Sequence, residues 1–462
     1  MESAFKINIW RMGIWLLFPI MGIQTYLHGQ GAKLLGYSIL FLPYCTLIVV
    51  GFPILVRRLS RLTISRKYIT TSLSFLAFIF LMVIASFRSI SSDFQSGQSF
   101  SARMLFIIVI VLLFAIYSHT QEENGKSQLG KRIWMDICIS IVVFLVLNLF
   151  AYAFLGLESV EGERYIVRGA SRISFLETKI EFPLVKNTRE FSQIAGLVAI
   201  IVFGATLSKT RKGRIGVREF FNAMLIALSM LVIILADARM TLFVTLFGLL
   251  MMYLFVRYRR FVSIAWGLSF FFLLFPLFYF LLLFSVNMRS GLNIFDSNLW
   301  TLTGRLYIWA SVLPEILRLD MSQILFGAGA YSQDLTGMNE NYAVLFTYLN
   351  DTRSVTYHNA MIQIFFDIGF VGSAVYVMLV LSILKAYQGR LIKLQASDPD
   401  RMYLVTGVVV LLYYLGLGTT EAITPIYYDS YLIVLVILIT SISIWQRKQP
   451  PTRRRKLELA AS

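Results

Sequence analysis

The chain has 462 residues, of which 57% are hydrophobic, and its mean hydropathy is +0.72. This composition excludes an ordinary soluble globular protein, in which about 45–50% of residues are apolar. The formal net charge of +17 would also suit a nucleic-acid-binding protein. The distribution of the charge along the chain has to decide between nucleic-acid binding and a membrane topology signal. Both cysteines, Cys45 and Cys138, fall inside apolar stretches, which excludes a disulfide framework or a cysteine metal cluster.

Apolar stretches long enough to cross a bilayer, which takes about 20 residues, recur along the whole chain. We count twelve and predict an all-α polytopic membrane protein with about twelve transmembrane helices and a large helical outer loop. No small-residue cleavage site follows the first stretch, so we interpret it as a retained span rather than a signal peptide. The predicted spans are 8–27, 34–56, 68–87, 103–118, 133–155, 191–208, 219–236, 240–256, 261–285, 360–384, 402–418 and 429–446.

Positive charge marks one side of these predicted spans. With the N-terminus inside, most of the 42 Lys and Arg residues fall on the inner side, and every inner connection is basic. This is what the positive-inside rule expects, and it favours a topology signal over nucleic-acid binding. The basic tail is then a topology anchor, with contact to anionic lipids as a minor addition. The expected divisions are helices 1–155, the basic outer loop 156–190, helices 191–285, the large outer loop 286–359, helices 360–446 and the inner tail 447–462.

Ten cations on the outer side lie in only two loops, 156–190 and 286–357. Long loops cross the membrane despite positive charge, so these side chains are either simply solvated or converge on an anionic ligand outside the membrane. The residues alone leave both interpretations open. The cations are Arg164, Arg168, Arg172, Lys179, Lys186 and Arg189 in the first loop, and Arg289, Arg305, Arg318 and Arg353 in the second.

The apolar run 219–256 is interrupted only at Asp237–Arg239. As one helix it would be about 57 Å long, nearly twice the ~30 Å hydrocarbon core, so it must fold back at this turn. Arg239 then lies at the outer membrane face. It is either a ligand-binding cation, a snorkelling anchor or a local partner of Asp237.

The large outer loop contains a helical pattern at residues 303–316, with Thr303 as a candidate N-cap. Trp309 suits a helix that lies in the membrane interface. Arg305 falls in the first turn, where a cation is unfavourable for the helix dipole. This mismatch favours a purpose for Arg305 beyond helix stability.

His358 lies where this loop ends and an apolar span begins, in a chain with three histidines. An imidazole titrates near neutral pH and suits general acid–base chemistry, so His358 is the first candidate catalytic residue; the alternative is a helix-start residue bonded to loop backbone. Asp367 lies about 180° around an ideal helix from His358, so we expect it to pair with a neighbouring helix instead. Gly369 returns to the His358 face and leaves room for a substrate or a packed helix. The C-terminal spans carry no candidate residue.

These residues together resemble the O-antigen ligase/O-antigen polymerase superfamily of bacterial envelope glycosyltransferases. The clearest element is His358-Asn359 followed by Asp367-x-Gly369-x-x-Gly372, which is similar to the family's His-Asn…acidic-x-Gly-x-x-Gly segment. Further similar elements are Gly304-Arg305 with Trp309, Gly327-x-Gly329, the turn Ala238-Arg239, and Arg172 followed by Asn187. The sequence departs from the family pattern at three places, which are Ala238 for Ser, Asp367 for Glu, and no Pro before Asn187.

The resemblance implies metal-independent, inverting transfer of a glycan from undecaprenyl diphosphate at the periplasmic face of the bacterial inner membrane, with both termini cytoplasmic and no cofactor. The acceptor is another lipid-linked repeat unit for a polymerase, or lipid A-core for a ligase. The expected partners are the lipid-linked donor, one of these acceptors, membrane lipids and a chain-length regulator, without nucleic acid.

We favour a polymerase because the basic loop 156–190 provides a second cationic surface for two lipid-diphosphate substrates; a ligase is the alternative. A flippase for lipid-linked oligosaccharides is less favoured, because a transporter should carry ionisable groups near the bilayer midplane. Several predicted spans contain none.

The resemblance also suggests roles for individual residues. His358 is expected to accept the acceptor proton, and neighbouring arginines would keep its imidazole neutral. Guanidinium groups bind phosphate oxygens bidentately and stay charged, so they replace a metal clamp. The expected diphosphate ligands are Arg305, Arg239 and Arg172, the supporting residues are Asn359, Trp309 and Asn187, and no metal ligands are expected.

Overall fold

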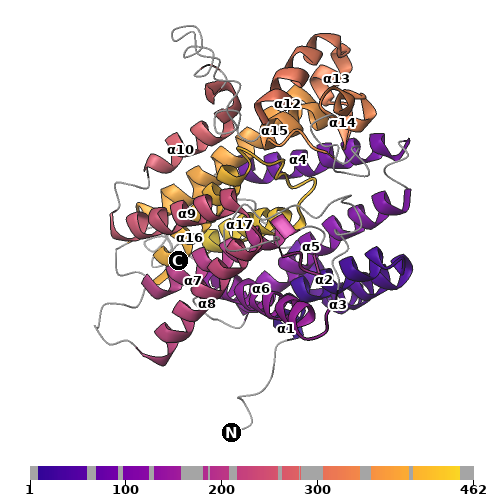
Figure 1. Cartoon of the computed structure of the whole chain (residues 1–462). Helices are drawn as coiled ribbons and strands as arrows, with labels where there is room; N and C mark the ends of the chain where they lie inside the picture. Colours follow the sequence, from indigo (N-terminus) through magenta and orange to yellow (C-terminus); the bar gives the residue numbers. More distant parts are fainter. Residues whose placement is uncertain are drawn as a thin grey trace, which may run out of the picture.

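A computed structural model shows a bundle of long apolar helices with a cluster of short helices at one end (Figure 1). Within the described residues there is no strand, and eight helices are long and apolar enough to cross a membrane. The prediction of an all-α polytopic membrane protein is therefore confirmed. The described residues are 9–59, 69–91, 97–123, 129–157, 180–185, 188–207, 216–258, 263–279, 281, 305–343, 355–394 and 399–447.

The helices of the bundle follow the predicted apolar stretches. They are α1 (Ile9–Trp15), α2 (Leu17–Gly29), α3 (Lys33–Leu59), α4 (Ile69–Arg88), α5 (Gly97–Glu123), α6 (Leu129–Ala153), α7 (Thr188–Leu207), α8 (Val217–Leu235), α9 (Arg239–Arg257), α10 (Ile264–Leu273), α15 (Ala360–Leu391), α16 (Pro399–Leu417) and α17 (Asp429–Arg447). The eight candidate spans lie on α3 to α9 and on α15. Shorter apolar helices on α10, α16 and α17 coincide with three more predicted spans.

The first predicted span is broken into α1 and α2 at Leu16. Pro19 lacks the N–H group that would bond to the carbonyl four residues earlier, which lies at the end of α1. A break at this position follows directly from that missing donor.

The apolar run 219–256 does fold back on itself, as its length requires. Helix α8 ends at Leu235 and α9 begins at Arg239. Asp237 adopts a left-handed backbone conformation in the turn, with φ of 48°, a conformation that Asp tolerates better than most residues.

Helix α16 lies inside the bundle, next to α17 (Figure 1). It also packs against α7, α9, α10 and α15. Nearly every described side chain of α16 is buried. A helix that is apolar all round and buried on all sides is typical of the core of a bundle. This packing fixes the connection that follows α16, residues 418–428.

Helix α15 is interrupted at Gly369, whose φ is 73°. A Cβ atom there would collide with the backbone of Leu325 at the end of α13 (Met321–Phe326). Gly327 makes the reciprocal close approach to the backbone of Asp367, and the N–H of Gly329 donates to the Asp367 carbonyl at 3.1 Å. Both glycines are required because two backbones meet here. Gly369 thus leaves room for a packed helix.

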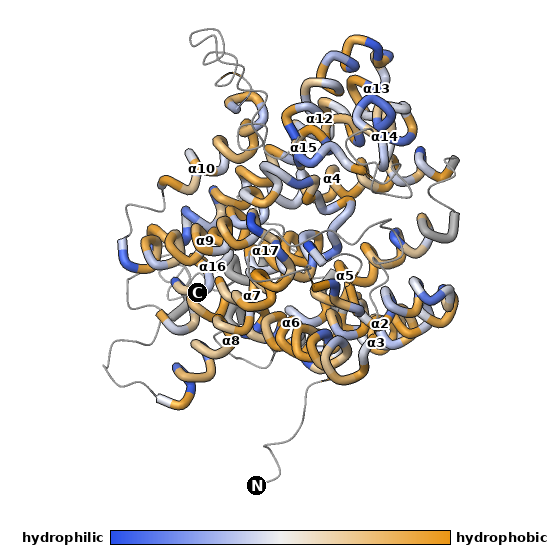
Figure 2. Tube along the Cα trace, viewed as in Figure 1, coloured by the Kyte–Doolittle hydropathy of each residue, from blue (hydrophilic) through white to orange (hydrophobic). Residues whose placement is uncertain are grey.

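The described part of the large loop forms short helices beyond one end of α15. They are α12 (Arg305–Val312), the 3-10 helix η7 (Leu313–Arg318), α13, α14 (Ser332–Leu335) and the 3-10 helix η8 (Met338–Asn341). The predicted helix at 303–316 is therefore present over its described part. Hydrophilic residues are frequent on α13 and α14, whereas hydrophobic residues predominate along the bundle (Figure 2).

A separate small core joins this loop to the first turns of α15. Its buried members come from α12, η8, the segment before α15 and α15 itself; they are Leu306, Ile308, Trp309, Val312, Met338, Tyr342, Val355, Tyr357, Ile362 and Phe366. Arg305 and His358 stand directly beside these buried residues in the sequence, so this core places them.

Candidate active site

Three charged or titratable side chains from distant parts of the chain meet at one carboxylate. Glu421, in the connection between α16 and α17, accepts a hydrogen bond from Arg305 Nη2. Its Oε2 atom lies 3.1 Å from His358 Nδ1 and 3.3 Å from Arg189 Nη1. We name His358, Arg305, Arg189 and Glu421 the Glu421 cluster.

Arg305 begins α12 and is fixed from two directions. Its Nε donates to the carbonyl of Thr420, next to Glu421. One turn further, Trp309 is 1% exposed and its indole N–H donates to the carbonyl of Tyr357 at 2.9 Å. Trp309 therefore connects the helix that carries Arg305 to the segment that carries His358. This hydrogen bond gives a physical basis to the supporting role predicted for Trp309.

His358 has a φ of 50°, a left-handed conformation that is uncommon outside glycine. The next residue, Asn359, caps α15, and its Oδ1 accepts the N–H groups of Met361 at 2.9 Å and Ile362 at 3.0 Å. The Asn359 amide also donates to the carbonyl of Thr419 at 2.8 Å. The start of α15 is thus bonded to the same connection that supplies Glu421.

Arg189 lies in the first turn of α7, and Ser192 donates to its carbonyl at 2.7 Å. The same Ser192 hydroxyl lies 3.2 Å from Thr241 Oγ1, in the first turn of α9. Arg239 therefore lies at the end of the bundle that carries Arg189. Its Nε is 3.6 Å from Asp237 on the same turn and its side chain is 59% exposed; among the described contacts it has none with the Glu421 cluster.

Burial and charge set the protonation of the cluster. Burial alone would raise the pKa of Glu421, but Arg189 and Arg305 outweigh it and hold that pKa well below its ordinary value. The pKa of His358 is lowered from 6.5, first because its imidazole is buried and further because Arg305 and Arg189 are close, although Glu421 acts in the opposite direction. The lowered pKa favours the neutral imidazole at pH 7, with burial as the larger cause, whereas the sequence predicted only the effect of the arginines.

The hydrogen bond to Glu421 also selects the tautomer of His358. An ionised carboxylate only accepts hydrogen bonds, so the proton of the neutral imidazole must lie on Nδ1. The lone pair then lies on Nε2, which becomes the basic nitrogen of the ring. An imidazole that is oriented by a carboxylate in this way is arranged to act as a general base.

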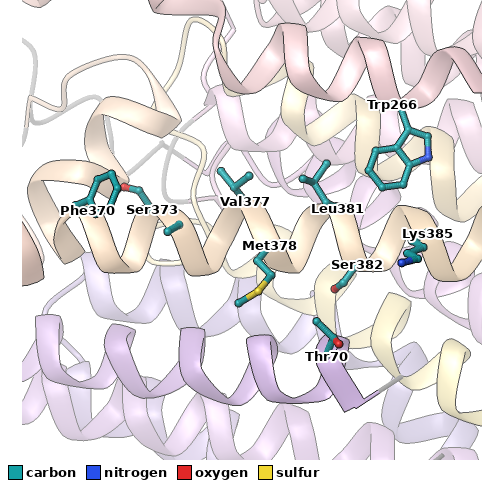
Figure 3. Close-up of a pocket in the computed structure, with 10 residues that line it drawn as sticks. Thr70, Trp266, Phe370, Ser373, Val377, Met378, Leu381, Ser382 and Lys385 are labelled. Atoms are coloured by element: carbon teal, nitrogen blue, oxygen red, sulfur yellow. The ribbon is translucent and has the colours of Figure 1, made fainter. Parts of the chain in front are cut away.

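An apolar groove runs along α15 beyond the break at Gly369, between α4 and α10 (Figure 3). Its volume is about 590 Å³. Its lining is almost entirely apolar, with Lys385 at one end. It is lined by Thr70, Trp266, Phe370, Ser373, Ala374, Val377, Met378, Leu381, Ser382 and Lys385.

The central part of the chain has a recognisable counterpart among known families. The O-antigen ligase family model matches residues 223–377. This match supports the O-antigen ligase/polymerase superfamily. It covers about a third of the chain and confirms the resemblance that the sequence motifs indicated. A search of curated proteins found no match.

The match to the O-antigen ligase family includes Arg239, Arg305 and His358 but neither Arg189 nor Glu421. Members of this family are glycosyltransferase-like enzymes that act on lipid-linked glycans. Of the remaining predicted residues, Arg172 and Asn187 lie outside the described part of the chain.

The sequence patterns pointed to no candidate residue in the C-terminal part of the chain and so missed Glu421, which lies between the last two spans at the centre of the cluster. A signal was present in the sequence. The connection between predicted spans 402–418 and 429–446 falls on the same side as His358, and Glu421 is its one carboxylate. An acid facing an excess of outer cations was the pattern to notice.

Of the ten outer cations, the structure describes Arg189, Arg305 and Arg318, and Arg318 pairs with Glu315 at the surface. Arg189 from the first loop and Arg305 from the second both reach Glu421. Within the described residues, no group of three or more His, Cys, Asp or Glu side chains could hold a metal ion.

Asp367 is buried and pairs with a neighbouring helix, the short helix α14, as well as with a connection and its own helix. It accepts from Ser332 of α14 through both Oγ, at 2.7 Å, and the backbone N–H, at 3.2 Å. Tyr427, in the connection before α17, donates to it at 2.8 Å, and Gln363 of its own helix donates at 3.0 Å. These partners lie on α14, on the connection between α16 and α17, and on α15 itself; the break at Gly369 lets the loop helices pack at this level.

Proposed function

We propose that this protein is a metal-independent, inverting glycosyltransferase that polymerises undecaprenyl-diphosphate-linked oligosaccharide units at the periplasmic face of the bacterial inner membrane. The observation that carries the proposal is the Glu421 cluster, in which a neutral, oriented imidazole lies beside two guanidinium groups. The family match over residues 223–377, which includes His358 and Arg305, supports the same reaction class.

The chemistry requires one proton transfer and one stabilised leaving group. The acceptor hydroxyl gives its proton to Nε2 of His358 while its oxygen forms the new bond to the anomeric carbon. The bond from that carbon to the diphosphate oxygen breaks, and the leaving diphosphate keeps the electron pair. Attack from the opposite face inverts the anomeric centre.

The leaving diphosphate needs positive charge, and Arg305 and Arg189 provide it beside the base. Arginine stays protonated and its planar fork matches phosphate oxygens. The pair carries two positive charges against the single charge of Glu421, so the cluster remains cationic. Arg239, at the same end of the bundle, and Arg172 remain proposed further ligands of the diphosphate.

The apolar groove on α15 is a suitable place for the isoprenoid tail. It lies on the helix that follows His358, and Phe370 is about 18 Å along an ideal helix from that residue. A long lipid tail spans such a distance. Apolar lining with one cation at its end favours a lipid occupant over a sugar.

Polymerisation rather than ligation is supported by loop 156–190, whose cations besides Arg172 and Arg189 suit a second lipid-diphosphate substrate; they are Arg164, Arg168, Lys179 and Lys186. Purified protein in liposomes would be given lipid-linked repeat units without lipid A-core. A ladder of lipid-linked polymer supports a polymerase. Transfer only after lipid A-core is added would establish the ligase instead.

Transport is the remaining alternative, and the same liposomes test it. A flippase would move the lipid-linked unit between leaflets and leave its length unchanged. Lengthened product that disappears in the His358→Gln variant supports transfer, whereas movement without lengthening would overturn the proposal.

A further inference from the structure

We propose that Gln363 and Asp367 are positioning residues for His358. Gln363 holds the backbone immediately before His358, and Asp367 sets the direction of the Gln363 side-chain amide. The expected effect of these residues on catalysis rests on the proposed function. Their effect on the position of His358 does not.

The backbone of Tyr357 is held at both of its polar groups. Its N–H donates to Oε1 of Gln363 at 3.2 Å, and its carbonyl accepts from Trp309 Nε1 at 2.9 Å. The Tyr357 side chain is fully buried in the small core between the loop and α15. The peptide bond that enters His358 therefore has little freedom.

The residues after His358 are held equally firmly. Asn359 caps α15 and bonds to Thr419, and the N–H of Ala360 donates to the Gly418 carbonyl at 2.8 Å. With both neighbours fixed, His358 is left with its left-handed φ of 50°. A non-glycine residue persists in such a conformation only where its surroundings impose it.

A glutamine side chain has two ends that are similar in shape, and only one of them accepts the Tyr357 N–H. Asp367 decides which end points there. Its carboxylate only accepts, so it draws the NH₂ end of Gln363 to 3.0 Å from Oδ1. The carbonyl end then points to Tyr357. The Gln363 amide also donates toward Gln333 Oε1 at 3.0 Å, which reinforces the same orientation.

The two side chains that make this link are completely enclosed. Gln363 and Asp367 are both 0% exposed, so water does not compete for their hydrogen bonds. They are four residues apart on α15, which places them on one face of the helix. The link to His358 therefore runs along the helix through Gln363 and the Tyr357 peptide group, although the Asp367 side chain does not touch the imidazole.

The experiment compares five variants of the full-length protein in liposomes, including the double variant Gln363→Met/Asp367→Asn. Gln363→Met keeps the side-chain length but removes the acceptor, Asp367→Asn replaces one of the two acceptor oxygens with an NH₂ donor, and Asp367→Glu keeps a carboxylate. The matched control is Tyr376→Phe, which removes a buried hydroxyl from the same helix at 2.6 Å from Tyr431 Oη, away from His358.

We expect Gln363→Met and Asp367→Asn to lower kcat by roughly tenfold to a hundredfold, because small displacements of a reacting group cost about that much. KM for the lipid-linked donor should change less than about twofold. Asp367→Glu should restore most of the rate, and the double variant should lose no more than Gln363→Met alone, because both substitutions break one link. Unchanged kcat in folded Gln363→Met protein would overturn the proposal.

A second measurement does not depend on transferase activity. Diethyl pyrocarbonate modification of His358, followed by mass spectrometry, is compared with that of His28 in the same molecule. The His358 side chain is 13% exposed, so displacement should raise its modification rate several-fold in Gln363→Met and leave it unchanged in Tyr376→Phe. Equal rates in Gln363→Met and the wild type would refute the positioning role. If the wild type transfers no sugar, the proposed function fails while this rate still decides the geometry.

Discussion

The carboxylate of Glu421 lies 3.1 Å from Nδ1 of His358, although 63 residues separate the two in the chain. Helices α15 and α16 lie between them in sequence, and the backbone bond from Ala360 to Gly418 closes this loop in space. The candidate base and the acid that orients it therefore belong to two different connections, which the central helix α16 brings together.

Removing the base should stop transfer. His358→Gln is expected to lower kcat by about 10²–10⁴-fold, the usual contribution of a positioned general base. The measurement is the length distribution of polymer formed in liposomes, with His28→Gln as the matched control. Near-normal polymer from His358→Gln would refute the proposed role.

Arg305→Ala should abolish polymer while the protein still inserts into the membrane, because a cation beside the leaving diphosphate is lost. The control is Arg318→Ala. Arg318 lies on the same loop, and its side chain is 80% exposed while it pairs with Glu315 at 3.0 Å. Equal loss of activity in both variants would point to general disturbance of the loop instead of a site-specific role.

Glu421→Gln should lower kcat by about 10²–10⁴-fold, because the amide no longer dictates the imidazole tautomer. It also leaves two guanidinium groups without their shared carboxylate. Glu315→Gln, which removes a solvent-facing carboxylate, should leave kcat unchanged. Comparable rates in Glu421→Gln and the wild type would exclude Glu421 from the reaction.

The pH dependence of kcat/KM should show an acid limb below pH 6.5, because the pKa of His358 is lowered from that value. Activity falls as the pH drops through the folded-state pKa and the base becomes protonated. Glu421 raises the pKa of His358, so Glu421→Gln should move the acid limb to still lower pH. An acid limb above pH 6.5 would contradict the burial that lowers this pKa.

Gly369→Ala should destabilise the protein by about 1–3 kcal/mol, since a side chain there is strained at positive φ. The added Cβ also collides with the backbone of Leu325. Gly389→Ala is the matched control on the same helix, where a Cβ meets nothing within 4 Å. Thermal unfolding in detergent measures both, and equal Tm values would show that the packing of α13 on α15 contributes nothing.

Much of the fold could be predicted because a bilayer imposes strong rules. Apolar length located the spans, and the length of 219–256 alone required the turn at Asp237. The break at Gly369 was not predictable from periodicity, because its cause is a contact with Leu325, which lies in another part of the chain.

The candidate site was half predictable for a similar reason. His358 and Arg305 stand out locally, since each is unusual for its position in the sequence pattern. Glu421 and Arg189 acquire meaning only through contacts over 63 and 232 residues of chain. Ideal helix geometry predicted that Asp367 does not orient His358 directly, but it does not reveal a link through Gln363 and the Tyr357 backbone.

The connection between α16 and α17 has a consequence for how the chain can be divided. The segment that matches the O-antigen ligase family ends at residue 377, before the connection that supplies Glu421. A fragment limited to that segment would retain the imidazole but lose the carboxylate that selects its tautomer and the carbonyls that anchor Arg305 and Asn359. The last two helices are therefore not a detachable anchor. Any truncated, fused or chimeric protein therefore has to contain α16 and α17 together with the segment that carries His358.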